Sequence, residues 1–271
     1  NEIIKKYSEL LLENAEVEKF IFGVLMNSEF FTYASDFGKD FVVMLQSKNI
    51  WPGIRVDKGG QLLSATDGEI VTQGIDDLPE RCEQYYKLGI KFAKWKASFT
   101  VKGPNELLPS HVAIADNVIA CARCASICQR NGLVPLLEIS LAIDKITSIQ
   151  NKATAIVKIL AALVKALSDH QVVLEGLLLQ IDTVSSCCGA CNSSKNKIYD
   201  AEATLRVLQY TIPCAIPCII FSSNYTSEVT TSTTVSSIEK LEGPIPWSLK
   251  LALGNGMHKS ILDEWKGLSE N

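Results

Sequence analysis

The sequence lacks the features that would place it in a membrane or on a nucleic acid. Among its 271 residues, no apolar run reaches the roughly 18 residues that a membrane-spanning helix needs. Charged residues make up 21% of the chain and the net charge is −4, so we expect neither nucleic acid nor an anionic membrane as a partner. Linker-like stretches are also missing, and we therefore expect a single domain over residues 1–271.

Cysteine occurs nine times, an odd count that does not suit a secreted disulfide framework. The amino-terminal residues predict a helix and not a signal peptide, which favours a reducing, cytoplasmic location. Cys188 and Cys191 have the spacing of half a zinc site, but no second pair follows at a matching distance. Cys121, Cys124 and Cys128 share one face of a predicted helix, where cysteine packs as a small apolar residue. We therefore expect no metal site.

Strand-like and helix-like segments alternate at intervals of about 30 to 40 residues. The expected strands lie at 20–26, 53–57, 91–95, 133–138, 172–180, 215–222 and 248–253. The expected helices between them include 112–130 and the long segment 147–169. Such alternation predicts one α/β domain with a parallel sheet. A closed (β/α)8 barrel has eight strands, so we predict a TIM-type barrel whose first strand is missing from this chain.

The stretch from Val172 to Gln180, which reads VVLEGLLLQ, is the expected strand on which the functional question depends. A continuous apolar run of this kind predicts a strand that is covered on both faces. In barrel enzymes the chemistry lies at the carboxyl ends of such strands, which here is Gln180. Glu175 interrupts the run, and we expect it to point inward toward Lys94 or Arg55, because a buried carboxylate needs a partner.

Six strings, taken together and in this order, resemble class I fructose-bisphosphate aldolase. They are GIRVDKG (53–59), TQGIDDLPERC (72–82), FAKWK (92–96), ASICQRNGLVPLLE (125–138), KALSDH (165–170) and LEGLLL (174–179). The resemblance implies a (β/α)8 barrel that is normally a homotetramer. The activity it implies is reversible cleavage of a ketose bisphosphate through a lysine Schiff base, with no metal or other cofactor.

The resemblance also implies roles for single positions. Lys94 matches the family's second active-site lysine, and Glu138 matches its acid–base carboxylate. The family's second glutamate is replaced by Ser140. The Schiff-base lysine directly follows the LEGLLL-like string, and that position holds Gln180. A carboxamide nitrogen is delocalised, so it neither attacks a carbonyl nor becomes an iminium electron sink.

Positions that bind phosphate in the family differ here as well. Arg55 stands where the family has lysine and Lys96 where it has arginine, exchanges that keep the charge and change its geometry. Ser223 matches the phosphate-loop serine, whereas the clamping arginine of the last strand is replaced by Asn255. The catalytic aspartate of the family's first strand has no counterpart.

These replacements predict an aldolase-like pseudoenzyme with a structural or interaction role in a larger assembly. The expected partners are other proteins, with the cytoskeleton as one candidate because members of this family bind actin filaments. A homo-oligomer is expected because the family is tetrameric. The alternative is an active class I fructose-bisphosphate aldolase-type lyase with an altered substrate, or one that forms its Schiff base on Lys94. A sugar-phosphate sensor is a third hypothesis, and Asn255 argues against it.

Overall fold

The computed structural model describes residues 17–27, 35–64, 66–102, 108–143, 147–184, 194–222 and 228–254. Within these ranges the elements in chain order are η1 (Val17–Lys19), β1 (Gly23–Met26), α3 (Ser35–Ser47), β2 (Trp51–Arg55), β3 (Gly60–Leu62), β4 (Ile70–Thr72), α4 (Leu78–Lys87), β5 (Phe92–Val101), α5 (His111–Arg130), β6 (Val134–Ile143), α6 (Ile149–Asp169), η2 (Leu174–Gly176), β7 (Leu178–Asp182), α7 (Ser194–Thr211), β8 (Cys218–Ser222), α8 (Glu228–Ile238) and β9 (Ser248–Ala252).

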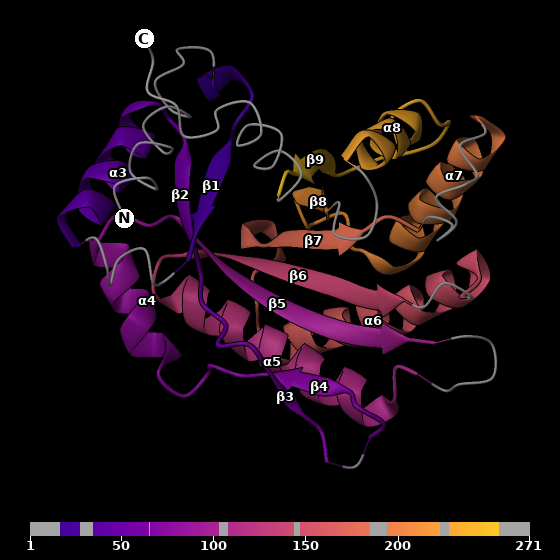
Figure 1. Ribbon diagram of the computed structural model, residues 1–271, viewed down its shortest axis with the longest axis horizontal. Helices are drawn as coiled ribbons and strands as arrows, with labels where there is room; N and C mark the ends of the chain where they lie inside the picture. Colours follow the sequence, from indigo (N-terminus) through magenta and orange to yellow (C-terminus); the bar gives the residue numbers. More distant parts are fainter. Residues whose placement is uncertain are drawn as a thin grey trace, which may run out of the picture.

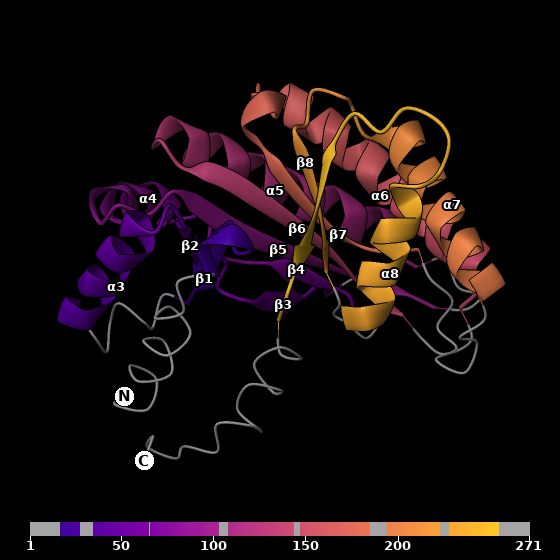
Figure 2. The same ribbon diagram turned by 90° about the horizontal axis from the view of Figure 1, so that it is seen from above.

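Seven strands form one parallel sheet in the order β1-β2-β5-β6-β7-β8-β9. Each of the seven strands expected from the sequence overlaps one of them, although β5 and β6 are ten residues long and extend beyond the expected ends. The sheet curves so that helices lie along its outer side (Figures 1 and 2). The order of a barrel with seven of its eight strands is therefore confirmed for the described part of the chain.

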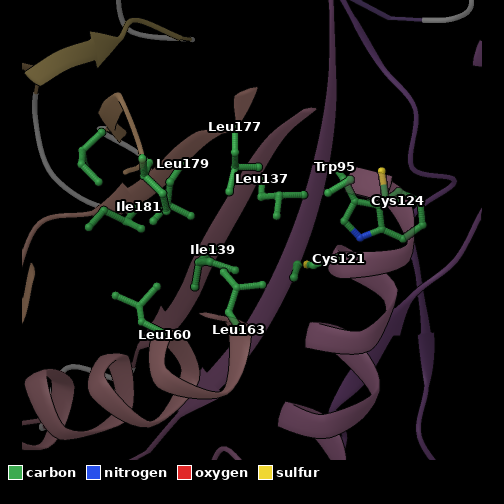
Figure 3. Close-up of a cluster of buried hydrophobic side chains, with 14 of the residues drawn as sticks. Trp95, Cys121, Cys124, Leu137, Ile139, Leu160, Leu163, Leu177, Leu179 and Ile181 are labelled. Atoms are coloured by element: carbon green, nitrogen blue, oxygen red, sulfur yellow. The ribbon is translucent and has the colours of Figure 1, made fainter. Parts of the chain in front are cut away.

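Side chains alternate between the two faces of each strand, and this alternation separates the core from the barrel interior. Trp95, Leu137 and Leu179 point outward, toward a layer that includes α5 and α6 (Figure 3). The neighbouring positions Lys94 and Glu138 therefore belong to the inward face. Apolar burial on the outer face holds the helices against the sheet and leaves the inner face for polar side chains.

Helix α5 carries the predicted stripe of buried cysteines. The Sγ atoms of Cys82 and Cys128 lie 3.9 Å apart, those of Cys124 and Cys128 lie 3.8 Å apart, and burial raises the pKa of Cys121 to about 12. These thiols pack as small apolar groups. Helix α5 is also long and apolar enough by composition to cross a membrane, but its buried side packs on β5 and β6, as in a core helix of a soluble protein.

A hairpin of β3 and β4, which the sequence patterns did not predict, packs against α5. The buried Asn117 side chain of α5 accepts a hydrogen bond from the Thr72 backbone N–H and donates to the carbonyl oxygens of Ile70 and Ala113. The strands are only three residues long, too short for a strong alternation pattern. One buried amide therefore holds a hairpin that propensity alone does not specify.

The predicted strand from Val172 to Gln180 is wrong in its first half. Residues Leu174–Gly176 form the 3-10 turn η2, and the strand is Leu178–Asp182. The Gln129 side chain of α5 accepts a hydrogen bond from the Val173 N–H and donates to the carbonyl oxygens of Val173 and Gly176. Because this side chain satisfies the backbone, the segment needs no neighbouring strand there.

Candidate functional site

The register of the sheet places the sequence-predicted residues in adjacent rows on its inward face. Arg55 of β2 pairs with Lys94 of β5. Two residues further along β5, Lys96 pairs with Glu138 of β6. Glu138 in turn pairs with Gln180 of β7. Residues in register on parallel strands share a face, so these five side chains lie on one surface.

Glu138 joins the two lysines of β5. Its Oε2 atom lies 2.7 Å from the Nζ atom of Lys94, and its Oε1 atom lies 3.5 Å from that of Lys96. The Glu138 side chain is 3% exposed and that of Lys94 is 14% exposed, so this ion pair is shielded from water. At this depth the attraction between two opposite charges is screened much less than on the surface.

Arg55 is held by Asp57, a residue that the motif comparison did not single out. The guanidinium donates to both carboxylate oxygens, with distances of 2.7 to 3.1 Å. These hydrogen bonds raise the pKa of Arg55 above its ordinary value. The backbone N–H groups of Lys96 and Gly59 also donate to Asp57. The spacing of two residues was the available signal, since it puts both side chains on the same face when a strand is extended.

Gln180 is 4% exposed and lies in the middle of β7, not at its end as predicted. The strand ends at Asp182, which the sequence reasoning missed. Asp182 accepts a hydrogen bond of 2.6 Å from the Ser222 hydroxyl of β8 and one of 3.2 Å from the Leu141 N–H of β6. Burial raises the pKa of Asp182, although both hydrogen bonds and the charge of Lys152 oppose the shift. Asp182 therefore ties three strands together beside Gln180.

Other predicted positions are not brought to this surface. Glu175, expected to point inward, is exposed in η2, so the prediction was wrong; Glu138 is the buried carboxylate that partners Lys94. Ser223 and Asn255 lie outside the described residues. Cys188 and Cys191 do too, and no group of three or more His, Cys, Asp or Glu side chains in the described ranges is arranged to hold a metal ion.

The fold and these contacts define an α/β barrel-type protein whose inner face carries a lysine–carboxylate cluster, which lies within β5, β6 and β7 and at the end of β2. In this fold class the reactive groups come from the carboxyl ends of several strands. The cluster offers two lysines, a guanidinium and buried carboxylates. These charged groups lie close together on one face. Each of the three cations, however, already has a carboxylate partner within the chain.

Comparison with known proteins places the chain in a family. The model of "Fructose-bisphosphate aldolase class-I" matches residues 1–271. The chain is 41% identical over 263 residues to "Fructose-bisphosphate aldolase 6, cytosolic" of Arabidopsis thaliana, covering 97% of this chain and 72% of the relative. It is 39% identical over 266 residues to the aldolase of Schistosoma mansoni, covering 98% and 72%.

A solved structure agrees with this assignment. Fructose-bisphosphate aldolase from Plasmodium falciparum, in complex with TRAP and a small-molecule inhibitor, superposes with a TM-score of 0.88 at 37% identity. The match covers 97% of this chain and 75% of that chain. The chain belongs to the class I fructose-bisphosphate aldolase family.

Proposed function

We propose that this chain is an aldolase-family barrel without Schiff-base lyase activity, which acts by binding other proteins. The observation that carries the proposal is the buried Gln180 on the inward face, next to Glu138 in the sheet register. By resemblance, this position holds the nucleophilic lysine in active members of the family. The amide has no lone pair free to attack a ketone, so the covalent intermediate does not form there.

The charge balance of the cluster supports the same proposal. Three cations, Arg55, Lys94 and Lys96, are paired with Asp57 and Glu138. A ketose bisphosphate carries about three to four negative charges, since each phosphate monoester contributes roughly 1.5 to 2 at neutral pH. Binding it here would require breaking ion pairs that are already formed, which costs the site much of the attraction that the substrate needs.

The competing hypothesis is an active lyase that uses Lys94 as the Schiff-base residue. One observation favours it: Glu138 lies 2.7 Å from the Lys94 amine and is placed to take its proton. Against it, the Lys94 amine is held in a short ion pair with Glu138 and would have to leave that partner to attack a carbonyl. We therefore favour the hypothesis that Lys94 does not form a Schiff base.

We further propose a cytoplasmic location and a binding partner that is itself a protein, with a homo-oligomer and a cytoskeletal filament as candidates. The plant relatives that match this chain are cytosolic or cytoplasmic isozymes. The Plasmodium falciparum aldolase was solved with TRAP bound, which is an example of a family member in complex with another molecule besides an inhibitor. An interaction role requires the barrel's shape and does not require Gln180 to be an amine.

The test is cleavage of fructose 1,6-bisphosphate by the purified chain, followed through the released triose phosphates. We expect no cleavage above a buffer control. The variant Lys94→Arg, which keeps the charge but cannot form an imine, is the matched control. Cleavage by the unchanged chain that borohydride stops would overturn the proposal, and loss of that cleavage in Lys94→Arg would establish the competing hypothesis.

A further inference from the structure

Three cysteine sulfur atoms lie together between helices α4 and α5. Cys82 belongs to α4, and Cys124 and Cys128 lie one turn apart in α5. The Sγ atom of Cys128 is 3.9 Å from that of Cys82 and 3.8 Å from that of Cys124. All three are buried free thiols. Cys128 therefore has two neighbours at almost the same distance, one on each helix.

Helix geometry decides which neighbour of Cys128 is able to form a disulfide with it. A disulfide needs Cβ atoms about 3.5 to 4.5 Å apart and sulfur atoms about 2.0 Å apart. Residues four positions apart in a helix have Cβ atoms about 5 to 6 Å apart, so a bond between Cys124 and Cys128 would distort α5. Cys82 lies on a separate helix, and a small shift of α4 toward α5 brings its sulfur to Cys128.

In the closed structure these thiols are poorly reactive toward oxidants. The contact with Cys128 and burial raise the pKa of Cys82, and burial raises the pKa of Cys124, whereas the thiolate is the reactive form. Helix α4 is ten residues long and buries only Leu78, Cys82 and Tyr85, so it is a small unit for local opening. We therefore expect oxidation to begin at Cys82 during brief openings of α4.

We propose that Cys82 and Cys128 form a disulfide when the chain meets hydrogen peroxide, and that this bond cross-links α4 to α5. In the first step the Cys82 sulfur attacks the peroxide and takes one oxygen, the O–O bond breaks, and one water leaves. When α4 closes again, the Cys128 sulfur attacks the resulting sulfenic acid, the S–S bond forms, and a second water leaves. The two thiols together lose two electrons, which the peroxide takes up.

The cross-link acts on a segment next to the lysine–carboxylate cluster. Arg81, the residue before Cys82, donates hydrogen bonds to the backbone oxygens of Val56 and Gly74. Val56 directly follows Arg55 of the cluster. A disulfide at Cys82 therefore fixes the helix that holds this segment in place. The inference does not depend on whether the chain cleaves fructose 1,6-bisphosphate.

The experiment treats the reduced, folded chain with hydrogen peroxide. The remaining thiols are then blocked with N-ethylmaleimide in mildly acidic urea, which limits disulfide exchange, and the chain is digested with trypsin for mass spectrometry. Cys82 falls in the peptide CEQYYK (82–87), whereas Cys124 and Cys128 share the peptide CASICQR (124–130). The proposed disulfide joins the two peptides. A Cys124–Cys128 disulfide leaves CASICQR unlinked and unblocked.

We expect the linked peptides to predominate in the folded chain and to fall several-fold when the same oxidation is done in urea, because the unfolded chain no longer holds the two sulfur atoms together. Cys82→Ala should abolish the link. Cys124→Ala, whose sulfur is equally close to Cys128, is the matched control and should keep it.

Oxidation should also raise the midpoint of urea unfolding by on the order of 1 M, because the bond closes a long loop in the unfolded chain. Cys82→Ala should not show this shift, and Cys124→Ala should. Three results would overturn the proposal: an unlinked CASICQR disulfide, cysteine acids without any link, or equal linkage in the folded and the unfolded chain. Peptide mapping of the unchanged chain decides among them without any variant.

Discussion

The two halves of the sheet differ in whether their inward-facing cations form ion pairs with carboxylates of the same chain. In the first half, β2, β5 and β6 hold Arg55, Lys94 and Lys96 against carboxylates of the same chain. In the second half, β7 carries an amide at Gln180 and β9 carries the exposed Lys250. The first half therefore contains a network of ion pairs, whereas the second half carries Gln180 at the position where, by resemblance, the family has its Schiff-base lysine.

The largest expected effect is on the first half. Glu138→Gln removes the carboxylate shared by Lys94 and Lys96 and leaves two cations close together at a shielded site. We expect a loss of about 3 to 5 kcal/mol in the free energy of unfolding, the usual cost of breaking a buried pair from one side. Urea unfolding measures it. Glu83→Gln, which breaks an exposed pair with Lys87, is the control and should change little.

The second largest effect is expected from packing between β2 and β5, in the first half of the sheet. A Cβ atom at Gly53 would overlap the Phe92 ring. Gly53→Ala should therefore destabilise the chain by about 1 to 3 kcal/mol through overpacking. The double variant with Phe92→Leu should recover part of that loss. If the double variant is as unstable as the sum of the two single ones, the ring contact is not the cause.

A pH dependence is expected in the second half. Burial raises the pKa of Asp182 above its ordinary value of about 3.9. The folded state therefore binds more protons than the unfolded state between these two pKa values, and stability falls as pH rises through that window. Asp182→Asn should remove this slope in the free energy of unfolding. An unchanged slope in the variant would show that another group causes it, with Glu138 and Lys152 the charged neighbours to examine.

The smallest effect is expected at Lys250 of β9, a strand at the edge of the described sheet. Lys250→Gln removes a cation that is exposed and has no carboxylate partner among the described residues. We expect a change within about 0.5 kcal/mol in the free energy of unfolding, as for most surface substitutions. A loss comparable to that of Glu138→Gln would contradict the comparison, since it would mean that Lys250 has a buried partner.

The sequence was sufficient for the strand order and for the family, because apolar runs and ordered motifs are local signals. The structure brings Lys94, Lys96, Glu138 and Arg55, which the motifs singled out, to one surface. The partners were not predicted. Asp57 contacts Arg55 two residues away, a local spacing that was available in the sequence. Asp182 contacts Ser222 through sheet register, which depends on tertiary pairing that no single segment encodes. Glu175 was misplaced for a related reason, because the side chain of Gln129, 46 positions earlier in the chain, satisfies the turn around it.

The central claim is that no lysine of this barrel forms an imine with a ketose phosphate. The direct measurement is the intact mass of the chain after incubation with dihydroxyacetone phosphate and sodium borohydride, which reduces any imine to a stable secondary amine. Gln180→Lys is the variant that reintroduces an amine at the lost position. The account predicts no stoichiometric mass increase for the unchanged chain. A reduced adduct that peptide mapping places on Lys94 would contradict it.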